Sequence, residues 1–239
     1  MITTRFLPKL SLICLASLLV STSALAANDD IRDLQDTGPM DEWRLIKNNE
    51  AKNIKAWDKK DLGRRYRSFK LDLVIDAPID RVARAYLDVE NFTHWFWEVK
   101  EAKLLKVVSD TEFYYYLVHR APVTQPTRDV IIRAQIEPMT ASKKYVILRL
   151  KAIPDYLPLR PPFIRMLAED MTIKWTPIAD NQTHFEVEGN IDPGGDMPVW
   201  AINAVQRQAP YYTVLGLQRR VTHRDVVNDT SPLPFTIRK

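Results

Sequence analysis

The sequence predicts an α+β fold in which a curved, largely antiparallel sheet packs against a long C-terminal helix. Three observations support this class: about eight runs of alternating apolar and polar residues, short connections between them, and one long apolar stripe of helical spacing near the C-terminus. Alternation indicates strands with one buried face. With 46% hydrophobic and 27% charged residues among 239, the composition is that of a globular protein, which excludes disorder as the dominant state.

The strands are predicted where apolar residues recur at every second position. The clearest runs lie at residues 69–75, 130–137, 146–151, 171–175 and 185–191, and weaker runs lie at 54–57, 102–108 and 113–118. Successive side chains of a strand point to opposite faces, so Leu148 is expected to face inward and Arg149 outward. Together the runs predict one sheet with a single apolar face.

Two helices are predicted. The first follows Pro78, which suits a first helical turn, and its apolar residues recur at spacings of three and four up to Val89. The second runs from about Pro198 to His223, and Pro210 within it is expected to cause a kink or a break. Because this helix covers only part of the sheet, the remaining apolar face must dimerise, be filled by large side chains or enclose a cavity. The spacing alone leaves these options open.

Residues 1–26 are predicted to be a secretory signal peptide. Arg5 and Lys9 precede an apolar run at residues 10–20, and the small-residue cleavage signal A-L-A follows at residues 24–26. The run is shorter than the roughly 20 residues that a membrane-spanning helix needs. We therefore expect a mature chain that begins near Ala27 and is periplasmic or secreted.

Residue counts argue against several kinds of chemistry. The single cysteine, Cys14, lies in the predicted signal peptide, so the mature chain lacks disulfides, cysteine catalysis and Cys-ligated zinc. The six glycines form no phosphate-binding loop, the four histidines show no metal-ligand spacing, and no serine lies in a G-x-S-x-G motif. A formal net charge of +4 is too small to indicate nucleic-acid binding. We predict no cofactor, no metal site and no catalytic residues.

An ordered series of short motifs resembles the START (StAR-related lipid transfer) domain. The series reads Trp43-Arg44-Leu45, Asp76-Ala77-Pro78, Trp95-x-x-x-Val99-Lys100-Glu101, Pro122 six residues before Arg128-Asp129, Phe163-Ile164-Arg165, and Gly189-x-Ile191-Asp192-Pro193-Gly194-Gly195-x-Met197-Pro198-x-Trp200. The resemblance places the first motif on a helix. It implies a secreted bacterial member with a helix-grip fold (START/Bet v 1-like), whose sheet wraps the C-terminal helix around an apolar tunnel for one lipid.

The resemblance also sets the domain boundaries. It covers residues 40–223, which leaves residues 27–39 as an N-terminal extension and residues 224–239 as a C-terminal tail. Several eukaryotic members carry an arginine–acid pair inside the tunnel. Here Ala134 stands at the arginine position and Tyr116 at about the acid position, so the headgroup preference of those relatives is not implied.

Strand alternation and the resemblance together give a set of predicted lipid-binding residues. They are the inward residues of the strands and the sheet-facing residues of the last helix: Tyr114, Tyr116, Ile132, Ala134, Leu148, Leu150, Met171, Ile173, Trp175, Phe185, Val187, Ile202, Val205 and Ala209. None of these side chains is charged. An enzyme would need a proton donor in the tunnel, so their character favours binding over catalysis. Aliphatic side chains and tyrosines suit a neutral or weakly polar ligand better than a charged one.

Two further groups of residues are assigned by position. The proline-rich segment from Ile153 to Phe163 lies where the resemblance places the loop that closes the tunnel mouth. Its predicted gate residues are Tyr156, Leu157, Leu159 and Phe163. The alternative for this segment is a rigid surface crossing whose apolar side chains fold back on the core. Arg128 and Asp129, at the start of a strand, are expected to form a structural clamp.

The leading functional hypothesis is a monomeric periplasmic carrier that holds one hydrophobic, lipid-like molecule and exchanges it at membrane surfaces. No nucleic acid is involved. One alternative is a helix-grip enzyme, of the cyclase or hydrolase type, that acts on a hydrophobic small molecule. Another is a lipid sensor that docks on a protein of the envelope.

Overall fold

The computed structural model describes residues 40–121 and 125–237, so the predicted signal peptide and the N-terminal extension lie outside the described residues. A ten-stranded sheet dominates, in the order β1-β2-β3-β10-β9-β7-β6-β5-β4, with β8 beside β6. Within the described part of the chain, neighbouring strands pair antiparallel except for β6 and β8. This arrangement confirms the predicted α+β class and its curved antiparallel sheet.

The strands follow the chain in short steps. They are β1 (Arg44–Asn49), β2 (Ile54–Lys59), β3 (Ser68–Ile75), β4 (Val99–Ser109), β5 (Glu112–His119), β6 (Arg128–Glu137), β7 (Val146–Ala152), β8 (Ile164–Arg165), β9 (Ala168–Ala179) and β10 (Gln182–Asp192). Each of the eight alternating runs found in the sequence overlaps one of these strands, and β1 and β8 are additional.

Strand β1 replaces the helix that the resemblance places at the Trp43-Arg44-Leu45 motif, so that prediction is wrong. The segment pairs antiparallel with β2, where Arg44 lies opposite Asp58. Arg44 Nη2 binds the buried carboxylate of Asp58 at 3.1 Å. The residues of β1 are mostly polar and exposed, as expected of an edge strand, and they leave no apolar alternation by which to recognise it.

The helices are short except for one. They are α2 (Ile79–Leu87), α3 (Val199–Arg220), α4 (Arg224–Asn228), and the 3₁₀ turns η1 (Glu50–Lys52) and η2 (Val89–His94). Helix α3 continues through Pro210, so the predicted break is absent. Since proline has no backbone N–H, the carbonyl of Gln206, four residues earlier, loses its usual helical donor.

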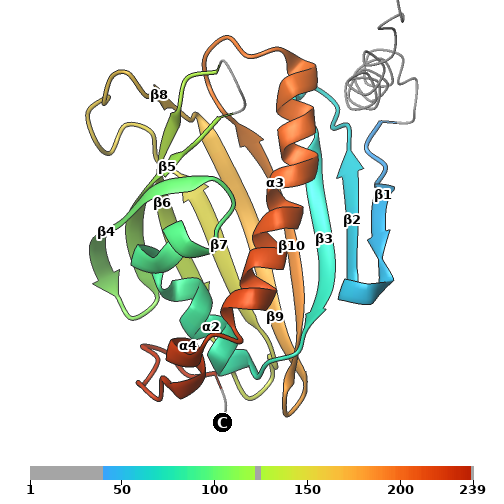
Figure 1. Ribbon diagram of the computed structural model, residues 1–239, viewed down its shortest axis with the longest axis vertical. Coiled ribbons are helices and arrows are strands. Elements are labelled where there is room, and N and C mark those ends of the chain that lie inside the picture. Colours follow the sequence, from blue (N-terminus) through green and yellow to red (C-terminus); the bar gives the residue numbers. More distant parts are fainter. Residues whose placement is uncertain (1–39, 122–124, 238–239) are drawn as a thin grey trace, which may run out of the picture. The chain divides into compact units, whose positions relative to one another are not determined.

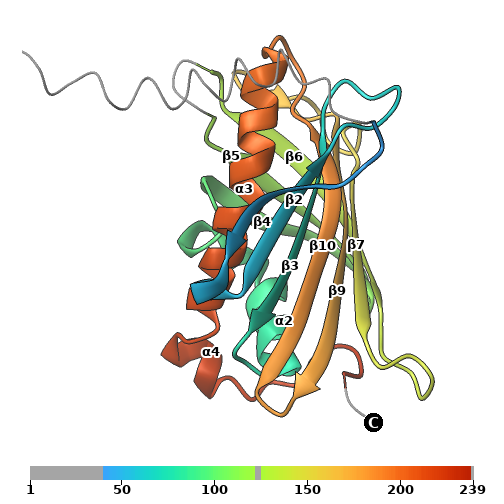
Figure 2. The same cartoon turned by 90° about the vertical axis from the view of Figure 1, so that its right-hand side faces the viewer.

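Helices α2 and α3 cover the concave face of the sheet (Figures 1 and 2). The main hydrophobic core lies between them and the sheet, and includes fully buried Leu73, Ile132 and Trp175. Helix α3 approaches the turn after η2 very closely: a Cβ atom added to Gly216 would lie 2.1 Å from the carbonyl oxygen of Trp95. Only a glycine fits at this crossing.

Among the helices of residues 40–121 and 125–237, none has the length and apolar character to cross a membrane.

Candidate functional site

A cavity of about 120 Å³ lies between the concave face of the sheet and helix α3. Strands β9 and β10 supply one wall, including Met171, Ile173, Phe185 and Val187, and α3 supplies the other. An engineered apolar cavity of about 150 Å³ accepts benzene. The cavity as it stands therefore fits a small apolar group, and a full acyl chain requires it to widen.

Seven of the predicted lipid-binding residues line this cavity. They are Met171, Ile173, Phe185, Val187, Ile202, Val205 and Ala209. The strand residues share the inward phase of β9 and β10, and the helical residues lie three to four positions apart on one face of α3. The structure thus brings two distant segments of the sequence together, and their contact with a ligand stays a prediction.

Five other predicted residues share the inward face but belong to the packed core. They are Ile132, Ala134, Leu148, Leu150 and Trp175, each at most 3% exposed. Aromatic side chains fill this part of the interior: the ring centroid of Tyr86 lies 5.6 Å from that of Trp175 and 6.0 Å from that of Trp95. The apolar face is therefore filled in one region and encloses a cavity in the other.

The prediction that Tyr114 and Tyr116 face the ligand space is wrong. In β5 the core-facing residues are Tyr115 and Leu117, and Tyr116 belongs to a separate apolar cluster. The Tyr116 hydroxyl donates to Asp129 Oδ2 at 3.0 Å. Aromatic residues occupy successive positions of β5 on both faces, so the sequence pattern does not reveal which face is inward.

The proline-rich segment packs on the sheet outside the cavity, so the prediction of its gate position is wrong. Of its four predicted gate residues, Tyr156 and Leu159 are exposed, whereas Leu157 and Phe163 pack on the cluster of Tyr116, Val118 and Ile131. Arg165 in β8 donates from Nη1 to the Leu157 carbonyl and from Nη2 to the Pro158 carbonyl, both at 3.0 Å. The segment is a surface crossing, as in the alternative, but of its four predicted gate residues only Leu157 and Phe163 fold back on the sheet.

Asp129 forms a structural clamp with Arg165 rather than with Arg128, which corrects the predicted pair. Asp129 is fully buried, and it accepts hydrogen bonds from Arg165 Nε at 3.0 Å and Nη2 at 2.9 Å. Arg128 directly precedes Asp129 in β6, so its side chain points to the opposite face. There it lines the cavity.

Four acidic or basic side chains that the sequence prediction missed line the cavity: His119, Arg120, Arg128 and Glu169. Arg128 and Glu169 each lie two positions before a predicted apolar run and in phase with its inward residues, whereas His119 directly follows the run of β5. Glu169, for example, precedes Met171 by two positions in β9. Continuing the alternation beyond the ends of these runs would have found Arg128 and Glu169 but not His119, because the phase predicted for β5 placed Tyr114 and Tyr116 inward. The expectation of an inward face without ionisable groups is therefore wrong.

Burial changes the proton affinity of two of these groups. Burial raises the pKa of Glu169 to about 7, and the negative charge of Asp170 adds to this effect. Burial lowers the pKa of His119 to about 4, against the opposing effect of a hydrogen bond with the Trp97 backbone. At neutral pH the imidazole is uncharged and the carboxyl of Glu169 is partly protonated.

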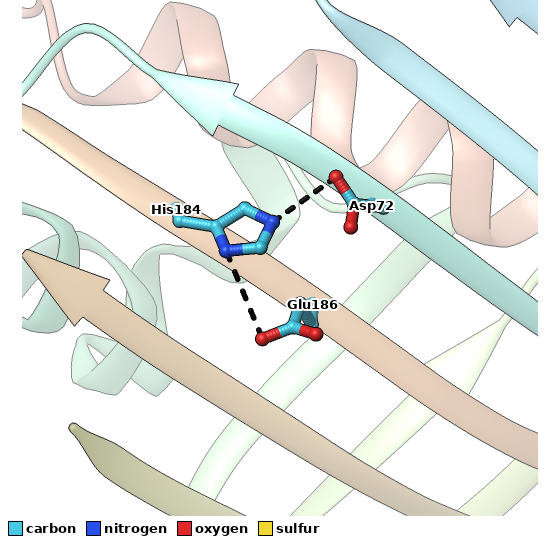
Figure 3. A group of neighbouring side chains, drawn as sticks. All are labelled: Asp72, His184 and Glu186. Atoms are coloured by element: carbon cyan, nitrogen blue, oxygen red, sulfur yellow. Dashed lines mark ion pairs between the residues drawn. The ribbon is translucent and has the colours of Figure 1, made fainter. Parts of the chain in front are cut away.

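A second cluster of titratable residues, Asp72, His184 and Glu186, lies on the outer face of the sheet (Figure 3). His184 Nε2 is 3.0 Å from Asp72 Oδ1, and its Nδ1 is 3.8 Å from Glu186 Oε2. Lys174 Nζ lies 2.7 Å from the same Glu186 oxygen. A lysine ammonium competes with a metal ion for this carboxylate, so the cluster is best described as a surface ion-pair network.

A curved antiparallel sheet that grips a long C-terminal helix over an apolar cavity defines the helix-grip class. The sequence pattern of the START domain matches residues 35–221, so the chain belongs to the START domain family. Members of this family typically bind lipids or other hydrophobic ligands.

Several known proteins are similar to this chain in sequence or in fold. A fragment of a STAR-related lipid transfer protein from Xanthomonas axonopodis is 29% identical, with a TM-score of 0.70 over 77% of this chain and 100% of that one. An uncharacterised protein of Pseudomonas aeruginosa is 27% identical over 185 residues, which are 77% of this chain and 89% of the relative. Human STARD10, at 17% identity and a TM-score of 0.66 over 81% of this chain and 78% of its own, shares the fold.

Proposed function

We propose that the protein is a monomeric carrier that holds one hydrophobic, lipid-like molecule and moves it between membranes of the bacterial envelope. The cavity between the sheet and α3 is the observation that carries this proposal, because its wall is almost entirely apolar. Moving an apolar surface from water into such a site is favourable by about 25 cal/mol per Å². Binding and release require no covalent step.

Entry of a whole acyl chain requires an element that moves, and the N-terminal half of α3 is suited to this. Ile202, Val205 and Ala209 in this half line the cavity. At its end, Pro210 deprives the Gln206 carbonyl of its helical hydrogen bond, and helices bend most readily at such positions. Displacement of this half would widen the cavity while the rest of α3 stays packed.

Exposed apolar side chains near the start of α3 support membrane contact at this end of the cavity. Leu167, Val199 and Trp200 are 58%, 38% and 43% exposed. They adjoin Met166 and Met197, which line the cavity. Apolar side chains beside a ligand site are suited to insertion into a membrane surface during exchange.

The compartment is proposed from the N-terminal sequence, which lies outside the described residues. The basic start, the apolar run and the A-L-A signal support export to the periplasm or beyond. Intact-mass analysis of protein recovered from the envelope fraction should give a chain that begins near Ala27. A cytoplasmic protein that retains Met1 would contradict the proposed compartment.

Transfer of a fluorescent single-chain lipid between donor and acceptor vesicles tests the carrier function. Ala209→Trp fills the cavity, so we expect transfer to fall at least tenfold. Gln208→Trp adds the same side chain at the adjacent, exposed position of α3 and should transfer at the wild-type rate. Equal transfer by the two folded variants would contradict a carrier that uses this cavity.

Proton-transfer catalysis is a second candidate function, favoured by Glu169. A buried carboxyl with a pKa of about 7 is suited to donate or accept a proton near neutral pH. If the protein is an enzyme, the ligand extracted after incubation with the wild type should be chemically altered. With Glu169→Gln the ligand should be retained but unaltered. Unaltered ligand from both proteins would exclude this candidate and leave the carrier.

A further inference from the structure

Arg128 is a buried cation at the edge of the cavity. Arg128 is 4% exposed and is the first residue of β6. Its side chain lies on the same, concave face of the strand as those of Val130 and Ile132. A guanidinium keeps its proton in proteins, so this side chain remains charged. Buried charges are costly unless they are paired, and a partner is therefore expected.

The described residues provide Arg128 with only one hydrogen bond. Nη1 donates to the backbone carbonyl of Pro126. Nε is buried without a hydrogen-bond partner in the described part of the chain. No described carboxylate lies within ion-pair distance of this guanidinium, so its positive charge has no counter-ion there.

Asp129 and Glu169 are the acidic residues to consider as partners of Arg128, and neither neutralises it. Asp129 points to the opposite face, where Arg165 and the Tyr116 hydroxyl occupy both of its oxygens. Glu169 lines the same cavity but forms no ion pair with Arg128, and its burial favours the protonated, uncharged carboxyl.

The surroundings of Arg128 are compatible with an incoming anion. His119 lies directly opposite Arg128 in the pairing of β5 and β6, and its imidazole is uncharged at neutral pH. The Nε2 atom of His119 is also buried without a partner among the described residues. Arg120, at the exposed rim, adds positive charge, although Glu98 lies 3.2 Å from its guanidinium.

We propose that the ligand carries an oxyanion, a carboxylate or a phosphate, that binds the guanidinium of Arg128 while its apolar chain occupies the cavity. A guanidinium matches either group with paired, charge-assisted hydrogen bonds. This inference rests on the proposed function and names its ligand class: amphipathic anions with one chain. It departs from the neutral or weakly polar ligand expected from the sequence, because the sequence prediction missed Arg128 as a cavity residue.

Matched ligands that differ only in the headgroup test the proposal. Binding of dodecanoate, dodecyl phosphate and dodecanol to the full mature protein is measured at pH 7 by calorimetry, with inorganic phosphate as a headgroup without a chain. We expect the wild type to bind at least one of the two anions at least tenfold more tightly than dodecanol. Inorganic phosphate should bind far more weakly than dodecyl phosphate, because it lacks the apolar chain.

Variants assign the preference to Arg128. Arg128→Gln should reduce the preference for the anion to within about twofold and leave dodecanol affinity unchanged, and Arg128→Lys should keep part of it. Arg133→Gln is the matched control, because Arg133 lies on the opposite face of the same strand, where it pairs with Glu112, and this variant should keep the preference. Thermal unfolding of each variant shows whether it is folded, and Arg128→Lys provides the comparison if Arg128→Gln does not fold.

The outcomes separate this inference from the proposed function. Wild-type binding of dodecanol as tight as that of both anions would overturn the inference and leave the carrier intact. An anion preference that persists in folded Arg128→Gln would also overturn it. If the wild type bound none of the three chain-bearing ligands, this result would contradict the carrier function itself.

Discussion

Glu169 shows how a single buried side chain couples the cavity to pH. It is 3% exposed, and its Oε2 atom has no hydrogen-bond partner among the described residues. Burial raises its pKa from 4.5 to about 7 in the folded protein. Between these two values the folded state holds a proton that the unfolded state releases. The contribution of Glu169 to stability is therefore present below about pH 4.5 and is lost as the pH rises through 7.

Glu169→Gln should remove this pH-dependent loss. We expect the free energy of unfolding of the variant to increase relative to that of the wild type as the pH rises from about 5 to about 8. The difference should change by up to about 3 kcal/mol, since one pKa unit corresponds to about 1.4 kcal/mol. Urea unfolding of both proteins across this range measures the difference. Other titrating groups cancel in the comparison, so a difference that does not change with pH would contradict the burial argument.

Leu148 and Arg149 test the assigned strand phase with neighbouring residues of β7. Leu148 is 1% exposed in the core, whereas Arg149 is exposed and pairs with Glu137 at 2.7 Å. Leu148→Asp should destabilise the protein by more than about 3 kcal/mol, because it removes packing and buries a charge. Arg149→Ser should cost less than about 1 kcal/mol, as exposed ion pairs contribute little. Similar urea midpoints for the two variants would show that the phase is wrong.

At the scale of elements, helix α3 both lines the cavity and packs closely on the turn after η2. Residues on both sides of Pro210 line the cavity, among them Ile202 and Leu217, whereas Gly216 lies directly against the Trp95 carbonyl. The close crossing fixes one end of the helix. Pro210 separates this fixed part from the half that we propose to move.

Gly216→Ala tests the close crossing by the sign of its effect. In an ordinary helix interior, alanine is more favourable than glycine by about 1 kcal/mol. Here the added Cβ would meet backbone at 2.1 Å, so we expect destabilisation by about 1–3 kcal/mol instead. Gln208→Ala, at an exposed position of α3, should be neutral or slightly stabilising. A stabilised Gly216→Ala in thermal unfolding would show that the helix and the turn are not in tight contact.

The elements with clear periodicity could be predicted from the sequence, and the others could not. Leu148 and Arg149 have unambiguous phase because apolar and charged residues alternate around them. The aromatic run around Tyr116 has no such contrast, so its phase depends on the tertiary pairing of β5. Edge strand β1 depends on pairing with β2 and on the ion pair between Arg44 and Asp58, neither of which leaves an apolar pattern.

The cavity residues were predictable only as far as alternation was followed. Predicted runs ended at their last apolar residue, and His119, Arg128 and Glu169 lie one or two positions beyond those ends. The rings of Tyr86, Trp95 and Trp175 fill part of the interior and so determine which inward residues line the cavity. The packing of these rings on one another cannot be predicted from the spacing of apolar residues in the sequence.

At the scale of the domain, the sheet and α3 together enclose the cavity in which we propose that an apolar molecule is shielded from water. The chain belongs to the START domain family, and the fold confirms the helix-grip architecture that this membership implies. The cavity of about 120 Å³ is smaller than an acyl chain needs. Ligand binding should therefore widen it and stabilise the folded state, by an amount that grows with the logarithm of the ligand concentration once this exceeds the Kd.

Native mass spectrometry of the protein purified from its own host cells, without detergent, tests the central claim most directly. We expect a mass that corresponds to one chain with one bound lipid-like molecule, and we expect Ala209→Trp, with its cavity filled, to carry none. Gln208→Trp, the exposed control, should carry the same molecule as the wild type. A ligand-free wild type, or a lipid bound equally by the wild type and folded Ala209→Trp, would contradict a carrier whose cargo lies in this cavity.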